Sequence, residues 1–114
     1  MKASCTVKEN YEFRRIYRKG RCVVCPCLVV YCQKNRKGQS RLGVTVSTKL
    51  GHAVVRNHVR RQLREIYRLH KAEMLPGYDV ILVARVKAVH TSYQRMEQCY
   101  LHALKQLYLL QEET

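Results

Sequence analysis

Six polar residues in the middle of the chain have a spacing that suits phosphate binding. They lie in the segment AVVRNHVRRQLREIYRLHK, which begins at Ala53. At about 100° of rotation per helical residue they share one face, within an arc of about 140°. The six are Arg56, Asn57, Arg60, Arg61, Arg64 and Arg68. A planar guanidinium donates paired hydrogen bonds that match phosphate oxygens and base edges. This face therefore predicts a contact with nucleic acid.

The alternative is that this charged face is simply solvated, as many are. Two features favour binding: the arginines lack acidic partners along the segment, and five of the six residues are Arg rather than Lys. Arginines at i, i+4 and i+8 repel one another, and Glu65 is the acidic residue placed to compensate in the middle of the segment. Apolar residues occupy the other side, within an arc of about 120° that predicts a face packed on a sheet. They are Val55, Val59, Leu63, Ile66 and Leu69.

The acidic and histidine residues lack the pattern of a nuclease active site. Such an enzyme needs carboxylates that converge on metal ions, or groups placed to transfer protons. The carboxylates are scattered: Glu9, Glu12, Glu65, Glu73, Asp79, Glu97, Glu112 and Glu113. The histidines show no ligand spacing such as HExxH: His52, His58, His70, His90 and His102. We therefore expect no catalytic residue in this chain.

The cysteines leave three interpretations: a disulfide framework, a zinc site or free thiols. They are Cys5, Cys22, Cys25, Cys27, Cys32 and Cys99. Without a secretion signal, free thiols are favoured over disulfides. The apolar run from Cys22 to Cys32 predicts a strand, on which Cys25 and Cys27 would point away from Cys22 and Cys32. Four ligands would then not converge, so we expect no metal site.

The overall charge requires a polyanionic partner. The chain has 114 residues with 22 Lys and Arg against 8 Asp and Glu, a formal net charge of +14. Nucleic acid is the leading candidate because neutralised phosphates release condensed counterions, and anionic lipid is second. No run approaches the roughly eighteen apolar residues of a membrane span, so we expect a cytoplasmic protein. The length fits a single domain, 1–114.

Hydrophobic periodicity indicates an α+β fold. A first helix is predicted up to Gly20, opened by a capping box of Thr6 and Glu9. Strands are predicted at 22–32 and 42–47, paired as a hairpin, followed by a helix from Gly51 to about Glu73 and a strand at 78–84. Strand, helix and strand in that order predict a parallel βαβ pairing. A final helix opens at Thr91 with Gln94, and its apolar stripe is Met96, Tyr100, Ala103, Leu104 and Leu107.

The stretch VTVSTKLGHAVVRNHVRRQLRE closely resembles the signature of the bacterial ribonuclease P protein family. In that signature a strand, a Ser and Lys turn, Gly and Ala-Val precede Arg-Asn and spaced basic residues. The resemblance extends to ENYEFRRIYRKG, to VVY at Tyr31 and to YDVILVAR, and so to nearly the whole chain. One departure is His58, where the family usually has a third basic residue, and a histidine is mostly uncharged near neutral pH.

The resemblance implies a small mixed four-stranded sheet with three helices and a left-handed βαβ crossover, whereas general topology favours the right hand. It also implies a function: assisting a catalytic RNA in the endonucleolytic removal of the 5′ leader from precursor tRNA. The implied partners are the ribonuclease P RNA subunit and precursor tRNA, with no membrane and no protein partner required. No cofactor is expected on the protein alone, and magnesium is expected in the RNA-containing holoenzyme.

The resemblance assigns two sets of residues. The RNA subunit is expected to contact Lys49, Arg56, Asn57, Arg60, Arg61, Arg64 and Arg68. The precursor-tRNA leader is expected to contact Phe13, Arg14, Tyr17 and Tyr31. From spacing alone the three aromatic residues could equally belong to the core. A ribosomal or RNA-chaperone type of basic RNA-binding protein is the alternative function, and a stand-alone nuclease is weaker still.

Overall fold

The computed structural model describes residues 6–111. Its helices are α1 (Asn10–Lys19), α2 (Ala53–His70) and α3 (Tyr93–Gln106). Its strands are β1 (Arg21–Val24), β2 (Leu28–Lys34), β3 (Arg41–Thr45) and β4 (Tyr78–Ala84). Three short 3₁₀ helices complete the order: η1 (Thr48–Leu50), η2 (Lys71–Glu73) and η3 (Val86–His90). The predicted α+β class is confirmed.

The four strands form one mixed sheet in the order β1-β2-β4-β3. β1 pairs antiparallel with β2, β2 antiparallel with β4, and β4 parallel with β3. The predicted parallel pairing is confirmed, but the predicted hairpin of 22–32 with 42–47 is wrong. β4, with four buried residues in succession, takes the central place between β2 and β3. A strand covered on both faces in this way is favoured inside a sheet rather than at its edge.

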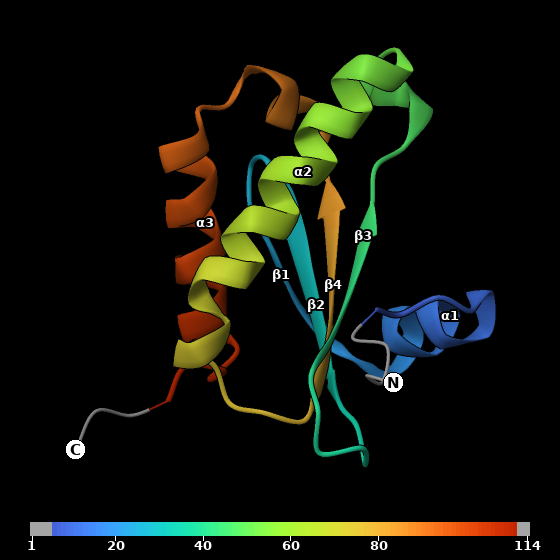
Figure 1. Cartoon of the computed structure of the whole chain (residues 1–114), viewed down its shortest axis with the longest axis vertical. Coiled ribbons are helices and arrows are strands. Elements are labelled where there is room, and N and C mark those ends of the chain that lie inside the picture. The colour runs from blue at the N-terminus through green and yellow to red at the C-terminus, as the bar shows by residue number, and fades with distance from the viewer. Residues whose placement is uncertain (1–5, 112–114) are drawn as a thin grey trace.

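The βαβ crossover is left-handed. In Figure 1 the parallel strands β3 and β4 both run upward, α2 lies in front of the sheet, and the chain passes from β3 on the right to β4 on its left. A right-handed crossover would move to the right when its helix faces the viewer. The handedness implied by the resemblance is therefore confirmed, against the general rule.

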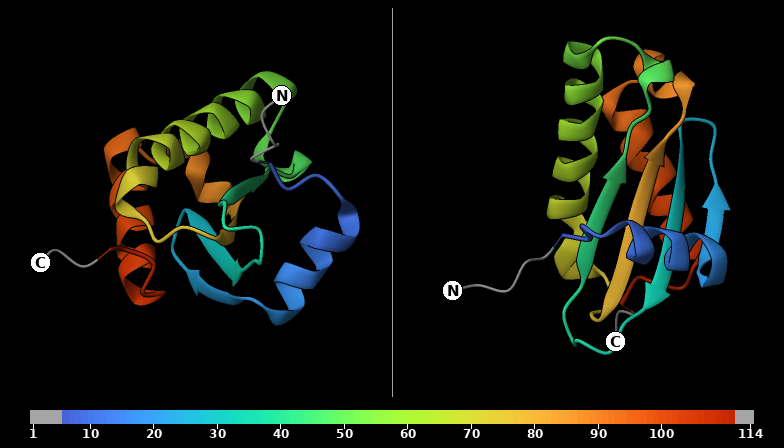
Figure 2. Two further views of the ribbon diagram at one scale, coloured as in Figure 1. Left: turned by 60° about the horizontal axis from the view of Figure 1, so that its bottom comes forward. Right: turned by 90° about the vertical axis from the view of Figure 1, so that its right-hand side faces the viewer.

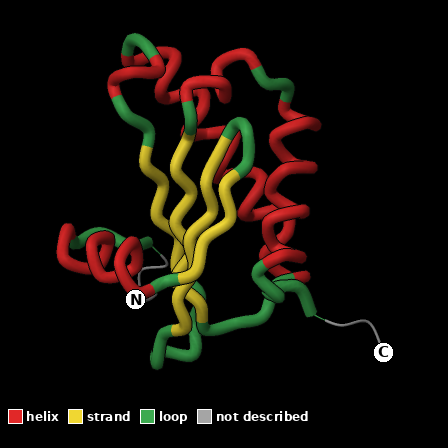
Figure 3. The backbone as a smooth tube through the Cα atoms, turned by 180° about the vertical axis from the view of Figure 1, so that it is seen from behind, coloured by secondary structure: helices red, strands yellow, loops and turns green. Residues whose placement is uncertain are grey.

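Helices cover both faces of the sheet. α2 and α3 lie on one face and α1 crosses the strands on the other (Figure 2), and from behind the strands stand in front of α2 and α3 (Figure 3). The alternation of strand side chains sets this division. Val80 and Leu82 belong to the large core under α2 and α3, whereas Ile81 packs with Val7 and Ile16 under α1.

The apolar side of α2 differs from prediction at its C-terminal end. Val59, Leu63 and Ile66 are buried as expected, but Leu69 is 48% exposed and Tyr67 is buried instead. α3 lies beside this half of α2 (Figure 1), so the buried face turns from the sheet toward α3. The predicted stripe on α3 is confirmed, because all five of its residues are buried.

The run from Cys22 to Cys32 is two strands, so the prediction of one strand is wrong. Pro26 interrupts it, since proline has no N–H to donate to a strand pairing, and the Cys25 N–H donates to the Leu28 carbonyl at 2.8 Å across the turn. Cys25 and Cys27 are buried in the turn. The cysteines among residues 6–111 are free thiols, and Cys5 lies outside that range.

Neither of the two predicted capping boxes forms. Thr6 forms an isolated bridge with Leu42, and Glu9 is the residue that precedes α1, with no side-chain cap. Ser92, not Thr91, caps α3, because its hydroxyl accepts a hydrogen bond from the Arg95 N–H at 3.2 Å. Within the described part of the chain, no helix has the length and apolar composition to cross a membrane.

Candidate nucleic-acid interface

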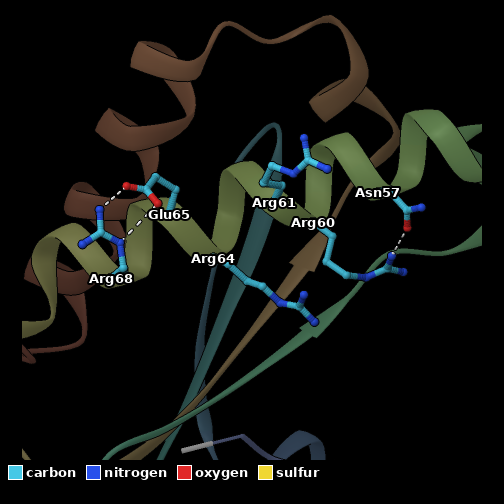
Figure 4. A pocket seen from close by; sticks show the side chains of 6 residues that line it. All are labelled: Asn57, Arg60, Arg61, Arg64, Glu65 and Arg68. Carbon is cyan, nitrogen blue, oxygen red and sulfur yellow. Dashed lines mark hydrogen bonds and ion pairs between the residues drawn. The ribbon is translucent and has the colours of Figure 1, made fainter.

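The predicted polar side of α2, here called the arginine face, is one exposed surface. It comprises Arg56, Asn57, Arg60, Arg61, Arg64 and Arg68, of which Arg56 and Arg60 are partly covered and the others exposed. An open depression of about 620 Å³ runs along it from Asn57 to Arg68. In Figure 4, Arg60 and Arg64 extend toward β3, whereas Arg61 points to the other side of the helix.

Side-chain hydrogen bonds hold residues toward the two ends of the arginine face, and the arginines between them lack acidic partners among the described residues. The Arg60 guanidinium donates to the Asn57 side-chain oxygen at 2.7 Å. Arg68 pairs with Glu65 through two hydrogen bonds, which lower the pKa of Glu65. Within residues 6–111, no acidic side chain pairs with Arg61 or Arg64. The uncompensated charge in the middle of the helix therefore fits a polyanion.

Lys49 stands at the entry to α2. It lies in η1, exposed, and its backbone N–H donates to the Ser47 hydroxyl at 3.3 Å. Gly51 follows with φ of 137°, a conformation that other residues rarely adopt, and turns the chain into the helix. The Ser-Lys-Gly part of the signature thus shapes the start of the arginine face and places one more cation beside it.

The three predicted aromatic residues are brought together between α1 and the sheet. The ring centroid of Tyr17 lies 4.8 Å from that of Tyr31 in an edge-on arrangement and 6.2 Å from that of Phe13. The Tyr17 hydroxyl is hydrogen-bonded to the Thr45 hydroxyl at 3.0 Å. Tyr17 is 37% exposed, while Phe13 and Tyr31 are partly buried. Burial raises the pKa of the Tyr31 hydroxyl.

An open cleft of about 570 Å³, here called the aromatic cleft, lies beside this cluster. Its lining residues are Asn10, Phe13, Arg14, Tyr17, Val44, Thr45, Val46 and Arg60. Tyr31 is not part of the lining and instead backs the ring of Tyr17. Arg60 belongs to both the arginine face and the cleft, which makes the two surfaces continuous.

Gly43 on β3 lets α1 approach the sheet. A Cβ at this position would lie 2.9 Å from two ring atoms of Phe13, closer than packed carbon atoms tolerate. The Phe13 ring therefore rests directly on the β3 backbone. The sequence predicted the aromatic residues but not the contact of Phe13 with Gly43, because these two residues are thirty positions apart.

A buried group of charges that sequence reasoning missed underlies α1. Arg41 on β3 donates two hydrogen bonds to Asp79 on β4, at 2.9 and 2.8 Å, and its guanidinium lies 2.7 Å from the Glu12 carboxylate on α1. Asp79 also accepts a hydrogen bond from Asn35 at 2.8 Å. Asp79 is 1% exposed. The sequence did contain a signal for this group: Asp79 is a lone carboxylate inside the apolar run 78–84, and a buried carboxylate requires a cation beside it.

His70 at the end of α2 joins a second ionisable group, away from the cleft. Its Nε2 atom lies 2.7 Å from Glu97 on α3, and its Nδ1 atom 3.3 Å from Glu73. Burial opposes the charged imidazolium, but the two carboxylates outweigh it and raise the pKa of His70. Protonated His70 thus ties α2 to α3.

We predict a pH-dependent stability from this contact. A raised pKa means that the contribution is fully present below the ordinary value of 6.5 and is lost as pH rises through the folded-state value. The replacement His70→Gln should therefore cost more free energy of unfolding near about pH 5.5 than near about pH 8.5. Urea unfolding of both proteins at the two pH values measures this. A cost that is equal at both, or larger at the higher pH, would contradict the assignment.

The two surfaces together define a class of protein. A row of arginines suits the phosphate backbone, and an aromatic cleft lined in part by Arg14 and Arg60 suits unstacked bases. Among residues 6–111 no three His, Cys, Asp or Glu side chains gather where they could hold a metal ion. The arginine face and the aromatic cleft together are the surface of a basic RNA-binding protein with an α+β fold.

Comparison with known proteins gives the family. The family model described as Ribonuclease P matches residues 1–108. The Ribonuclease P protein component of Natranaerobius thermophilus is 38% identical over 109 residues, covering 96% of this chain and 95% of the relative. That of Alkaliphilus oremlandii is 39% identical over 110 residues, covering 96% of both. A solved structure of the Staphylococcus aureus RNase P protein has a TM-score of 0.87 at 35% identity, covering 96% of this chain and all of that one.

This chain belongs to the ribonuclease P protein family. It is the protein subunit of an endoribonuclease that contains RNA, and it associates with the ribonuclease P RNA. The holoenzyme removes the 5′ leader of precursor tRNA, so the function implied by the resemblance is confirmed. The ribosomal or RNA-chaperone alternative is not favoured.

Proposed function

We propose that the protein divides its two surfaces between two RNAs. The arginine face with Lys49 binds the ribonuclease P RNA, and the aromatic cleft binds the single-stranded leader of precursor tRNA. The catalytic RNA, with its magnesium, performs the cleavage in the cytoplasm. In this arrangement the chain supplies no catalytic group. It holds the substrate leader beside the RNA and lowers the repulsion between the two RNAs.

One observation carries the proposal, namely that Arg60 lines both surfaces. A leader lying across Phe13 and Tyr17 would reach the arginine face without crossing a neutral gap. Arg14 at the edge of the cleft adds a second cation for the leader phosphates. Aromatic faces accept any base, so such a cleft holds a leader with little dependence on its sequence.

We predict that Tyr17→Ala weakens holoenzyme binding to precursor tRNA with a leader of several nucleotides by about fivefold or more. The reason is that stacking on an aromatic side chain contributes about 1–3 kcal/mol per base. Tyr31→Ala should act in the same direction, because it removes the ring behind Tyr17. Binding of the reconstituted holoenzyme to labelled precursor tRNA, by filter retention or anisotropy, measures both effects.

Mature tRNA, which has no leader, is the control for damaged folding or assembly. Its affinity should remain unchanged in both variants. Tyr108→Ala supplies a matched variant, because Tyr108 is 80% exposed and lies far along the chain from the cleft residues, just after α3. Equal losses for both RNAs, or no loss for either, would remove the aromatic residues from leader binding.

A further inference from the structure

α1 is attached to the sheet by few buried apolar residues. The buried apolar cluster between α1 and the sheet is small compared with the cluster that holds α2 and α3. It consists of Val7, Ile16 and Ile81, with Phe13, Tyr31 and Val83 partly buried against it. α1 also has no side-chain cap at its N-terminus. A helix with so small an apolar contact needs other interactions to fix its orientation.

The buried charges provide such an interaction. Glu12 is 7% exposed and faces the sheet, where its carboxylate lies 2.7 Å from the Arg41 guanidinium. Arg41 cannot follow a movement of α1, because its two hydrogen bonds to Asp79 hold the guanidinium on the sheet. The hydrogen bond from Arg41 lowers the pKa of Glu12, so the carboxylate stays charged at neutral pH. Glu12 is thus tied to a fixed point.

The position of Glu12 on the helix connects this point to the aromatic cleft. Around the axis of α1, Phe13 lies about 100° from Glu12 and Tyr17 about 140° from it. Ile16 lies between Glu12 and these rings, at about 40°, and is fully buried against the sheet. A rotation of α1 that lengthened the ion pair would therefore shift the Phe13 ring on Gly43 and strain the hydrogen bond of Tyr17 to Thr45.

We propose that Glu12, held by Arg41, is a positioning residue of the aromatic cleft: the ion pair sets the rotation of α1 and thereby the placement of the rings that receive the leader. Glu12 does not touch the leader in this scheme and acts through Phe13 and Tyr17. The proposal rests on the proposed function of the cleft and adds the residue that sets its geometry.

Three variants test it. Glu12→Ala removes the ion pair, while Arg41 keeps its hydrogen bonds to Asp79. Glu12→Gln keeps an oxygen that accepts from Arg41 and should behave between wild type and Glu12→Ala. Glu9→Ala is the matched control, since it removes the same charge from an exposed residue at the start of the same helix.

The first measurement is made on the protein alone. Because two ring atoms of Phe13 lie against Gly43, the ring current should displace the Gly43 Hα resonances from their ordinary positions. We expect this displacement to shrink in Glu12→Ala, partly in Glu12→Gln, and to persist in Glu9→Ala. The resonances of α3 residues should stay in place in all three, which excludes general unfolding.

The second measurement is holoenzyme binding to precursor tRNA and to mature tRNA. Holoenzyme with Glu12→Ala should bind precursor tRNA at least about fivefold more weakly, the lower end of the contribution of one stacked base, with no loss of affinity for mature tRNA. Loss of a negative charge by itself would strengthen RNA binding. The expected change is therefore opposite in sign to the simple charge effect that Glu9→Ala should show.

The outcomes separate this proposal from the proposed function. If Tyr17→Ala loses the preference for leader-bearing RNA but Glu12→Ala retains it, the positioning role is wrong and the cleft stands. If the Gly43 resonances do not move in Glu12→Ala, the ion pair does not set the rotation of α1. If wild-type holoenzyme shows no preference for leader-bearing RNA, the cleft is not a leader site and both proposals fail.

Discussion

Replacing Asp79 by alanine is expected to lower the free energy of unfolding by about 3 to 5 kcal/mol, the usual cost of removing one partner of a buried ion pair. Asp79 accepts hydrogen bonds from Arg41 and Asn35 and is almost fully buried. Without it, the Arg41 guanidinium stays buried with Glu12 as its remaining carboxylate partner. Urea unfolding at neutral pH, followed by circular dichroism, measures the loss.

Glu12→Ala is the internal comparison for this prediction. It leaves the two hydrogen bonds between Arg41 and Asp79 in place, so its cost should be clearly smaller, about 1 to 2 kcal/mol. Equal losses of unfolding free energy for the two variants would mean that Asp79 stabilises the fold no more than the Glu12–Arg41 ion pair does. A cost below about 1 kcal/mol for Asp79→Ala would contradict the buried ion pair itself.

At acid pH the difference in free energy of unfolding between wild type and Asp79→Ala should become smaller. Burial alone would raise the pKa of Asp79, but the hydrogen bonds from Arg41 and Asn35 outweigh it and hold that pKa below its ordinary value of 3.8. A lowered pKa contributes stability that is present above the ordinary value and is lost as pH falls through the folded-state value. The loss measured near neutral pH should therefore shrink progressively below about pH 4.

The sequence was sufficient for the three helices, for β4 and for the polar side of α2. The pattern of α2 predicted which arginines share a face, because helical rotation depends on spacing alone. Strand β4 was predicted with its observed bounds, since an apolar run flanked by Gly77 and Arg85 leaves little choice. The left-handed crossover could not come from local pattern, and it required the resemblance to a family.

What the sequence did not predict depends on contacts between distant residues. In the sheet β4 lies between β2 and β3, and no turn motif in the sequence predicts this order. The seat of Phe13 on Gly43 and the network of Glu12, Arg41 and Asp79 join three separate elements. Pro26 was a local signal that should have divided the first predicted strand, because proline lacks the N–H that strand pairing needs.

The arginine face gives the largest expected effect on binding. Replacing Arg56, Arg61 and Arg64 together by alanine should weaken binding to the ribonuclease P RNA by about 150- to 2000-fold, if each loses a hydrogen bond of about 1–1.5 kcal/mol. Arg60 is kept because it also lines the aromatic cleft, so the variant tests the RNA-subunit surface alone. The fold should survive, since none of the three side chains is in the buried core.

Salt dependence and a matched variant decide whether phosphate contacts cause this loss. Three lost phosphate contacts should lower the slope of log affinity against log salt concentration by about 2 to 3, at about 0.7 to 0.9 per contact. Replacing Lys87, Arg95 and Lys105 by alanine removes the same charge from exposed positions in η3 and α3. That control should change affinity and slope far less, because those residues lie outside the arginine face. If both triple variants lost the same affinity, net charge rather than a defined surface would hold the RNA, and the assignment of α2 would fail.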